Sequence, residues 1–258
     1  MSAAALPLDG RVAVVVGGTS GIGLALARGL ADAGADVAPL SRRQEQVDAA
    51  AGEVEQRGRR AARITGDVAD RASLEAALAA VVAQLGKVDI LVNCAGITKR
   101  TPTLDVTDDE WTSILGTNLT GTWRACQVFG RHMLGNGYGR IINIASLASF
   151  VGLFEVAAYT ASKAGVAGLT RALAVEWGGR GVNVNAIAPG VYRTALNEKL
   201  LDGTERGKEF LLRTPMRRFG RVEELAGACV FLASDAASFV NGEVLAVDGG
   251  FLASGVNQ

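Results

Sequence analysis

The sequence contains a single histidine, His132, and three cysteines that lie far apart, Cys94, Cys126 and Cys229. One histidine cannot build a multi-histidine zinc site, and the cysteines form no CxxC pair, so we expect neither a metal site nor a disulfide framework. No stretch reaches the roughly 18 apolar residues of a membrane span. The opening segment MSAAALPLDGR also lacks the basic and apolar regions of a secretion signal. We therefore expect a cytoplasmic protein with no membrane contact.

An excess of charge of either sign is also missing, since 26 Lys and Arg residues balance 26 Asp and Glu residues. Nucleic-acid binding depends on a basic surface. We therefore expect a small-molecule substrate and no nucleic-acid partner. The chain has 258 residues and a hydrophobic content of 49%. It shows no Pro/Ser-rich linker and no repeat. We interpret residues 1–258 as one domain.

Short β-branched runs alternate with alanine-rich helical patterns along the whole chain. The expected strands are Arg11–Val16, Asp36–Leu40, Ala61–Thr65, Val88–Val92, Arg140–Ile144, Val182–Ile187 and Val244–Val247. The expected helices are Gly21–Ala33, Gln44–Arg57, Ser73–Leu85, Ala157–Gly178, Val222–Ser234 and a stretch from Asp108 to Met133 interrupted near Gly116 and Gly121. This alternation predicts an α/β, doubly wound Rossmann domain whose seven-stranded parallel sheet carries helices on both faces.

A cluster of glycines follows the first expected strand directly. Gly17, Gly21 and Gly23 are spaced G-x-x-x-G-x-G and open the first expected helix. They permit a tight turn, a close approach to a pyrophosphate and close packing of helix on strand, while the helix start offers free N–H groups to phosphate. The strand–turn–helix context favours dinucleotide binding over an ordinary turn. The expected contacts of this loop are Gly17, Thr19, Ser20, Gly21, Ile22 and Gly23.

The end of the second expected strand selects between NAD and NADP. An acidic residue there binds the ribose 2′-hydroxyl of NAD, whereas a basic residue accommodates the 2′-phosphate of NADP. This sequence has Ser41 and Arg42 at that point and no acid. We therefore expect NADP, with NAD as the alternative. Arg42 and Arg43 are also explained as the solvated start of a helix.

A serine, a tyrosine and a lysine form the candidate catalytic set. Ser146 ends the strand Arg140–Ile144, and Tyr159 and Lys163 lie one turn apart on one face of the next helix. The pKa of tyrosine is about 10 in isolation, too high for a base at neutral pH. A nearby ammonium favours the phenolate, so we expect Lys163 to lower the pKa of Tyr159.

Together, the glycine loop and the Tyr-x-x-x-Lys pair resemble the short-chain dehydrogenase/reductase family, whose usual patterns are TGxxxGxG and YxxxK. Val16 stands where the family usually has Thr. The resemblance covers essentially the whole chain and adds Asn118 as a fourth catalytic position. It implies further cofactor contacts at Asp67, Val68, Asn93, Ala95, Gly96, Tyr159, Lys163, Pro189, Gly190, Val191 and Thr194.

The resemblance also implies roles for these residues. Tyr159 is expected to exchange a proton with the substrate oxygen, and Ser146 to hold that oxygen by a hydrogen bond. Lys163 is expected to bind the nicotinamide ribose and tune Tyr159, and Asn118 to position a water that relays protons from Lys163. Relatives are usually tetramers, so a homotetramer is expected.

Two segments are expected to line the substrate pocket: the residues between Ser146 and Tyr159, and a loop at about 191–219. An arginine there would clamp a carboxylate, although each basic residue is individually explained as a surface charge or a subunit contact. The polar candidates are Lys99, Arg100, Arg193, Asn197, Lys199, Arg206, Arg213 and Arg217.

The segment 213–227 resembles the gluconate 5-dehydrogenase branch of the family, which implies a sugar acid or polyol as substrate. Reduction of a 3-oxoacyl thioester is the main alternative, because reductases of that type share much of this segment. Other small alcohols or ketones also stay open. A dinucleotide-binding regulator without catalysis is the alternative from a different class, and the occupied catalytic positions argue against it.

Overall fold

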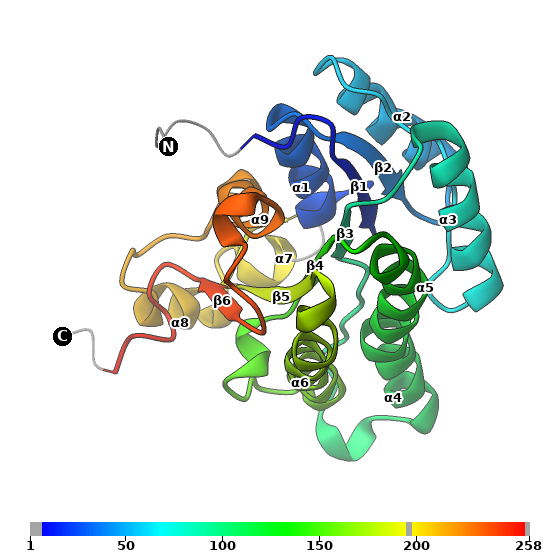
Figure 1. The fold of residues 1–258 in the computed structure, drawn as a ribbon. Coiled ribbons are helices and arrows are strands. Elements are labelled where there is room, and N and C mark those ends of the chain that lie inside the picture. The colour runs from blue at the N-terminus through cyan, green and yellow to red at the C-terminus, as the bar shows by residue number, and fades with distance from the viewer. Residues whose placement is uncertain (1–6, 195–197, 256–258) are drawn as a thin grey trace.

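A computed structural model describes residues 7–194 and 198–255, and its strands form one parallel sheet (Figure 1). Within the described residues the sheet has six strands, in the order β2-β1-β3-β4-β5-β6. Their bounds are β1 Val12–Val16, β2 Asp36–Leu40, β3 Ile90–Asn93, β4 Gly139–Ile144, β5 Val182–Pro189 and β6 Val244–Val247. The predicted doubly wound Rossmann class is confirmed.

Helices cover both faces of this sheet (Figure 1). They are α1 Gly21–Asp32, α2 Gln44–Glu55, α3 Arg71–Leu85, α4 Asp108–Leu115, α5 Gly121–Asn136, α6 Ala157–Trp177, α7 Glu198–Leu201, α8 Glu205–Arg213 and α9 Ala226–Ala233. Side chains alternate between the two faces of a strand. Val14 and Leu91 therefore pack with α3, α5 and α6. Val15 and Ile142 pack with α1 and α9 on the opposite face.

The seventh expected strand, Ala61–Thr65, is wrong as a strand. This segment lies beside β2 but pairs with it only through two isolated bridges, Val37 with Ala61 and Ser41 with Thr65. The N–H of Val37 donates to the carbonyl oxygen of Arg60, just before the segment, so the alternate position Pro39 faces the segment as well. Because proline has no N–H to donate, the ladder is interrupted midway. The sequence pattern alone did not reveal this interruption.

One expected helix differs in the structure, and the interruption expected in another is present. The predicted helix Val222–Ser234 is a 3₁₀ turn, Val222–Leu225, followed by α9. The predicted interruption near Gly116 and Gly121 is confirmed, because a π-helical segment, Gly116–Thr120, separates α4 from α5. Such π segments often occur at functional sites. None of the described helices is long and apolar enough to span a bilayer.

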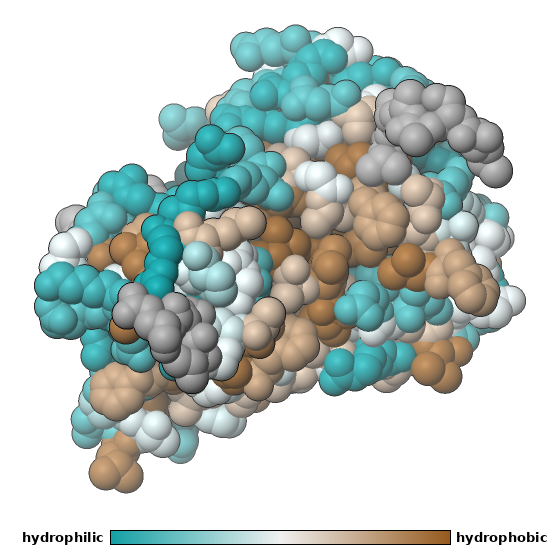
Figure 2. Space-filling model, turned by 90° about the vertical axis from the view of Figure 1, so that its left-hand side faces the viewer, coloured by the Kyte–Doolittle hydropathy of each residue, from teal (hydrophilic) through white to brown (hydrophobic). Residues whose placement is uncertain are grey.

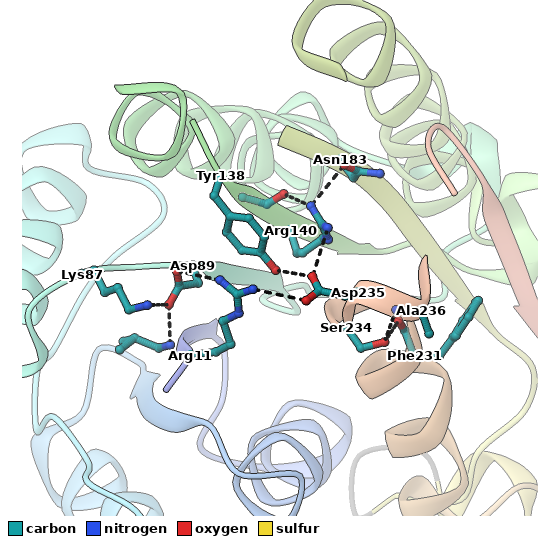
Figure 3. A network of polar contacts seen from close by, with 12 residues as sticks. Arg11, Lys87, Asp89, Tyr138, Arg140, Asn183, Phe231, Ser234, Asp235 and Ala236 are labelled. Carbon is teal, nitrogen blue, oxygen red and sulfur yellow. Dashed lines mark hydrogen bonds and ion pairs between the residues drawn. The ribbon is translucent and has the colours of Figure 1, made fainter. Parts of the chain in front are cut away.

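Charged side chains close the amino-terminal edge of the sheet (Figure 3). The buried carboxylate of Asp89 accepts the backbone N–H of Val12 at 2.9 Å and pairs with Lys87 at 3.0 Å. Arg11 approaches the same carboxylate at 3.7 Å. Asp89 lies just before β3 and Val12 begins β1, so the carboxylate ties the entrances of two neighbouring strands together.

The ring of Tyr138 lies between two guanidinium groups in the same cluster (Figure 3). Arg11 is 3.9 Å and Arg140 is 4.6 Å from the ring centroid. Asp235 lies in the short 3₁₀ turn after α9. Its carboxylate pairs with Arg11 at 3.5 Å and with Arg140 at 3.6 Å. The cluster therefore pairs its charges internally, at the edge opposite the carboxyl ends of the strands.

Replacing Asp89 tests how much this edge contributes to stability. Asp89→Ala leaves the Val12 N–H without its acceptor and two cations without their buried partner, so we expect a loss of about 2–3 kcal/mol. Asp235→Ala is the control, because its carboxylate is mostly exposed and should cost less than about 1 kcal/mol. Urea unfolding measures both. Equal losses in the two variants would contradict the assignment.

Candidate active site

The glycine loop lies where the chain order of the sheet reverses, between β1 and β3. Gly17 has φ +80°, and a Cβ on it would lie 2.7 Å from the backbone nitrogen of Ala95, which follows β3. A Cβ on Gly23 would lie 2.0 Å from the Gly17 carbonyl oxygen. Side chains are therefore excluded at both positions. The crevice at this point of a doubly wound sheet is where ligands bind.

The first turn of α1 is open to a ligand. Ser20 occupies the N-cap position, but its side chain makes no capping hydrogen bond, so it leaves the backbone N–H groups of that turn available. Ser20 and Gly21 are exposed, and Thr19 and Ile22 are half-buried beside them. The residues expected to cradle a pyrophosphate therefore fit that group.

The carboxyl end of β2 carries the expected ribose-binding residues. Arg42 is exposed and has no hydrogen bond or ion pair with any described residue, while the hydroxyl of Ser41 donates weakly to the Arg43 carbonyl oxygen at 3.5 Å. The Asp67 carboxylate accepts the N–H of Ala69 at 2.9 Å. An uncommitted cation beside a serine suits a 2′-phosphate better than a diol.

Val68, one of the expected cofactor contacts, has its side chain in the hydrophobic core. It is buried, and a Cβ on Gly121 would lie 2.8 Å from the Val68 Cβ. Only its backbone is therefore placed to contact a ligand. Gly121 starts α5, so this close packing sets the position of α5 and of the π segment before it.

The candidate catalytic residues come together at the carboxyl end of β4. Ser146 is buried directly after that strand, and a hydrogen bond joins it to Tyr159 in the first turn of α6. Lys163 lies one turn further along α6, with its ammonium 5.8 Å from the centroid of the Tyr159 ring. The structure thus brings Tyr159 and Lys163 together, as their spacing in the sequence predicted.

The electrostatics of this cluster differ from expectation. Burial raises the pKa of Tyr159, and the hydrogen bond with Ser146 lowers it only in part. Lys163 donates instead to the Ile144 carbonyl oxygen at 2.7 Å, and burial lowers the pKa of Lys163 to about 8. Desolvation disfavours the charged form of both groups. The expected lowering of the Tyr159 pKa by Lys163 is therefore not found: burial sets the direction of the shift, and Ser146 is the group that opposes it.

Asn118 lies fully buried in the π segment and holds the loop after β3. Its side chain accepts the Ile97 N–H at 2.8 Å and donates to the Ile97 carbonyl oxygen at 2.9 Å. A Cβ on Gly96 would lie 3.3 Å from Asn118 Oδ1 and 3.6 Å from Lys163 Nζ. Gly96 therefore lies close to the side chains of both Asn118 and Lys163, and a larger residue at this position would crowd both.

Ser162 is a residue of this cluster that sequence reasoning missed. Its hydroxyl accepts a hydrogen bond from the Asn118 amide at 3.0 Å and donates to the Tyr159 carbonyl oxygen at 2.7 Å. It thus links the π segment to the turn of α6 that carries Tyr159. Its position directly before Lys163 was the only available signal in the sequence.

A chain of buried amides lies beneath the site. Asn93, the last residue of β3, donates to Asn143 in β4 at 2.9 Å, and Asn143 donates to the hydroxyl of Thr170 in α6 at 3.0 Å. These neutral bonds fix β3, β4 and α6 relative to one another. Burial raises the pKa of the neighbouring Cys94 thiol to about 11, so the thiol stays protonated at neutral pH and is a poor nucleophile.

The segment after β5 returns to the glycine loop. Gly190, which follows Pro189, donates to the Val247 carbonyl oxygen at 2.9 Å, and its absent Cβ leaves room for Asp248. The methyl group of Thr194 lies 4.0 Å from where a Cβ on Gly21 would be.

A parallel bridge between Tyr192 and Gly220 closes the segment that contains α7 and α8. Val191, at its start, accepts the N–H of Gly220 at 2.9 Å. The expected candidate Asn197 lies outside the described residues, as does the side chain of Lys199.

The basic candidates for a carboxylate clamp separate into two groups. Four are engaged elsewhere: Arg193 pairs with Asp202 and Glu198, Lys99 with Glu110, Arg213 lies over Phe251, and Arg217 donates to the Leu212 carbonyl oxygen. Arg100 and Arg206 instead contact the segment between Ser146 and Tyr159. Among the basic candidates whose side chains the structure describes, these two are therefore the ones that contact that segment.

Comparisons with known proteins agree with this geometry. A family model described as enoyl-(acyl carrier protein) reductase matches residues 16–252. A D-threitol dehydrogenase of Mycolicibacterium smegmatis is 46% identical over 95% of this chain and 94% of its own. A gluconate 5-dehydrogenase of Gluconobacter oxydans is 41% identical over 96% of both chains. The crystal structure of a Burkholderia cenocepacia gluconate 5-dehydrogenase with NADP and tartrate has a TM-score of 0.94 at 40% identity, covering 97% of this chain and 98% of that one.

The buried lysine gives a pH-dependent prediction. The pKa of Lys163 in the fold is about 8, and that of lysine in an unfolded chain is about 10.4. Between these values the unfolded chain binds more protons, so the contribution of Lys163 to stability rises with pH. The stability of the wild-type protein relative to Lys163→Met should therefore rise by on the order of 1–3 kcal/mol from pH 7 to pH 10.

Unfolding by denaturant across this pH range measures the difference. Lys208→Met is the control, since Lys208 is an exposed residue of α8 paired only with Glu205, and its difference should stay nearly constant with pH. A Lys163→Met difference that is equally flat would show that the ammonium is not destabilised by burial.

Proposed function

The chain belongs to the short-chain dehydrogenase/reductase family of oxidoreductases, and we propose that it interconverts a secondary alcohol and a ketone of a sugar acid or polyol, with NADP as cofactor. The observation that carries the proposal is the cluster of Ser146, Tyr159 and Lys163 beside a glycine loop that excludes side chains. When bound, the cofactor supplies or accepts the hydride.

The protein's own groups handle the proton and the substrate oxygen. In reduction, the Tyr159 hydroxyl donates its proton to the carbonyl oxygen, and the Ser146 hydroxyl stabilises the charge that develops there. A raised pKa keeps Tyr159 protonated and ready as the acid. Lys163, with a pKa near neutrality, returns the proton, and Asn118 positions the water that connects Lys163 to solvent.

The carbohydrate substrate is supported by the named relatives and by the two arginines at the pocket. The D-threitol and gluconate enzymes act on polyhydroxylated chains. Reduction of an acyl thioester is the second candidate, favoured by the description of the matching family model. The segment 191–219 is proposed to line the pocket for whichever substrate binds.

A direct assay tests this proposal. With NADPH, we expect kcat/KM for 5-keto-D-gluconate to exceed that for an acetoacetyl thioester by a large factor. Tyr159→Phe should keep NADPH binding and lower turnover by about 10²–10⁴-fold, because the proton donor is gone. A preference for the thioester would move the protein to acyl chemistry, and near-normal turnover of Tyr159→Phe would remove Tyr159 from the mechanism.

Cofactor choice is tested at the end of β2. Ser41→Asp places a carboxylate where it would accept the ribose 2′-hydroxyl of NADH and repel the 2′-phosphate of NADPH. We expect the ratio of kcat/KM for NADPH over that for NADH to fall at least about tenfold. A tenfold change corresponds to a free-energy difference of about 1.4 kcal/mol. An unchanged ratio would show that Ser41 and Arg42 do not select the cofactor.

We also propose that the protein is a homotetramer that buries the β6 end of its sheet. Figure 2 shows apolar side chains across the side of the molecule where α8, α9 and β6 lie. Phe239, between α9 and β6, is fully exposed, and Val175, on α6, is 88% exposed. Large exposed apolar areas mark subunit contacts. Light scattering or sedimentation that gives the mass of a single chain would contradict the tetramer. A cytoplasmic location stays a prediction.

A further inference from the structure

The side-chain amide of Asn118 is held in one orientation by its neighbours. Its nitrogen donates to the Ile97 carbonyl oxygen at 2.9 Å and to the Ser162 hydroxyl at 3.0 Å, and Oδ1 accepts the Ile97 N–H at 2.8 Å. The single proton of the Ser162 hydroxyl goes to the Tyr159 carbonyl oxygen at 2.7 Å, so this hydroxyl can only accept from Asn118. A flipped amide would place Oδ1 against acceptors and lose these bonds.

The side-chain oxygen of Asn118 keeps one lone pair for a further donor. A carbonyl oxygen has two lone pairs, and the Ile97 N–H uses one of those on Oδ1. Both hydrogens of the amide nitrogen are already donated. The backbone carbonyl oxygen of Asn118 accepts the Thr122 hydroxyl at 2.7 Å within the π segment. The side chain can therefore accept one more hydrogen bond but cannot donate one.

This oxygen faces Lys163 across Gly96. The position that a Cβ on Gly96 would take lies 3.3 Å from Asn118 Oδ1 and 3.8 Å from its Cγ, which is to the side of the C=O bond, where a lone pair lies. The same position is 3.6 Å from Lys163 Nζ. An ammonium has three hydrogens, and one of them goes to the Ile144 carbonyl oxygen at 2.7 Å. A water centred close to this position would contact both groups.

Burial changes across this position. Asn118 and Lys163 are buried, whereas Gly96 and Ile97 are exposed. A water beside Gly96 would therefore extend the buried Lys163 toward the surface. Waters inside proteins need two or more polar partners, and Oδ1 and Nζ supply two.

We propose that Gly96 and Ser162 are positioning residues for the proton relay through Lys163. Gly96, because it has no Cβ, leaves room for a water that bridges Asn118 Oδ1 and Lys163 Nζ. Ser162 keeps Oδ1 turned toward that water. The inference rests on the proposed function and deepens it, since it names the atom that holds the relay water and two residues that secure it.

The fixed orientation of the amide determines how the water passes a proton. One hydrogen of the water is donated to Asn118 Oδ1, so one hydrogen is left for Lys163. After Lys163 has given a proton to the Tyr159 phenolate, its neutral amine takes this hydrogen from the water. The water takes a replacement proton from solvent through its own lone pair. An amide turned the other way would donate to the water and occupy that lone pair.

Crystal structures test the geometry without turnover. The wild type should show a water within about 3.2 Å of both Asn118 Oδ1 and Lys163 Nζ, and Gly96→Ala should lose it. The added methyl group lies 3.3 Å from its nearest neighbour, and the φ of Gly96 lies outside the left-handed region, so we expect this variant to fold. Gly52→Ala, in α2, is the matched control, because its Cβ meets nothing within 4 Å. A wild type without a water at this position overturns the inference.

Isotope effects test the role in the reaction. If proton return becomes slow in Gly96→Ala, kcat should fall on the order of tenfold while KM and NADPH binding change little. The solvent deuterium isotope effect on kcat should rise, and the effect of deuterium at the transferred position of NADPH should shrink. Ser162→Ala should show the same pattern with a smaller loss, because Ile97 still orients the amide. Gly52→Ala should match the wild type.

A purely structural disturbance gives a different pattern, because misaligned hydride transfer keeps or enlarges the hydride isotope effect and leaves the solvent effect unchanged. That pattern in Gly96→Ala overturns the inference, and in Ser162→Ala it overturns the role of Ser162. The assay uses 5-keto-D-gluconate or the acetoacetyl thioester, whichever the wild type reduces. A wild type that reduces neither would count against the proposed function, while the crystal structures still decide whether Gly96 leaves room for the bridging water.

Discussion

The architecture of the site depends on one close approach between backbones. The turn after β1 and the residues after β3 meet so tightly that a single Cβ on Gly17 would overlap Ala95. This contact forms the floor of the crevice at the reversal of strand order, and it brings the glycine loop beside Gly96 and hence beside Lys163 and Asn118. A side chain at Gly17 would separate the cofactor cradle from the catalytic cluster, because both are built on those two strand ends.

Charge is distributed unequally between the two edges of the sheet. At the amino-terminal edge, Asp89 and Asp235 pair with arginine and lysine, so the strand entrances are held by compensated ions. At the carboxyl edge, the links between elements are neutral amides and hydroxyls, as in the bond from Asn143 to Thr170. The ion pairs of this edge, such as Arg100 with Glu155, lie further out, in the loops that follow the strands.

Much of the fold and of the site could be predicted, because the determining features are local. Strand and helix alternation, the glycine spacing and the i, i+4 relation of Tyr159 to Lys163 are properties of short segments, and the structure contains them. The seventh strand was predicted wrongly because Ala61–Thr65 has a strand-like sequence, and the obstacle is Pro39 in its neighbour. Ser162 was missed because its partners, Asn118 and the Tyr159 carbonyl, converge only in the folded chain.

The sequence by itself determined the class of the fold, the glycine loop that is the proposed dinucleotide site, and the identity of the candidate acid. Only the tertiary structure decided the electrostatics. Burial, opposed by the hydrogen bond with Ser146, raises the pKa of Tyr159, and burial is a property of the whole fold. In sequence, Arg193 and Arg206 were equivalent candidates, yet folding pairs Arg193 with the Asp202 carboxylate and brings Arg206 to the Phe154 carbonyl oxygen. Ion pairing depends on which distant segments are brought within a few ångströms, and no local pattern records that distance.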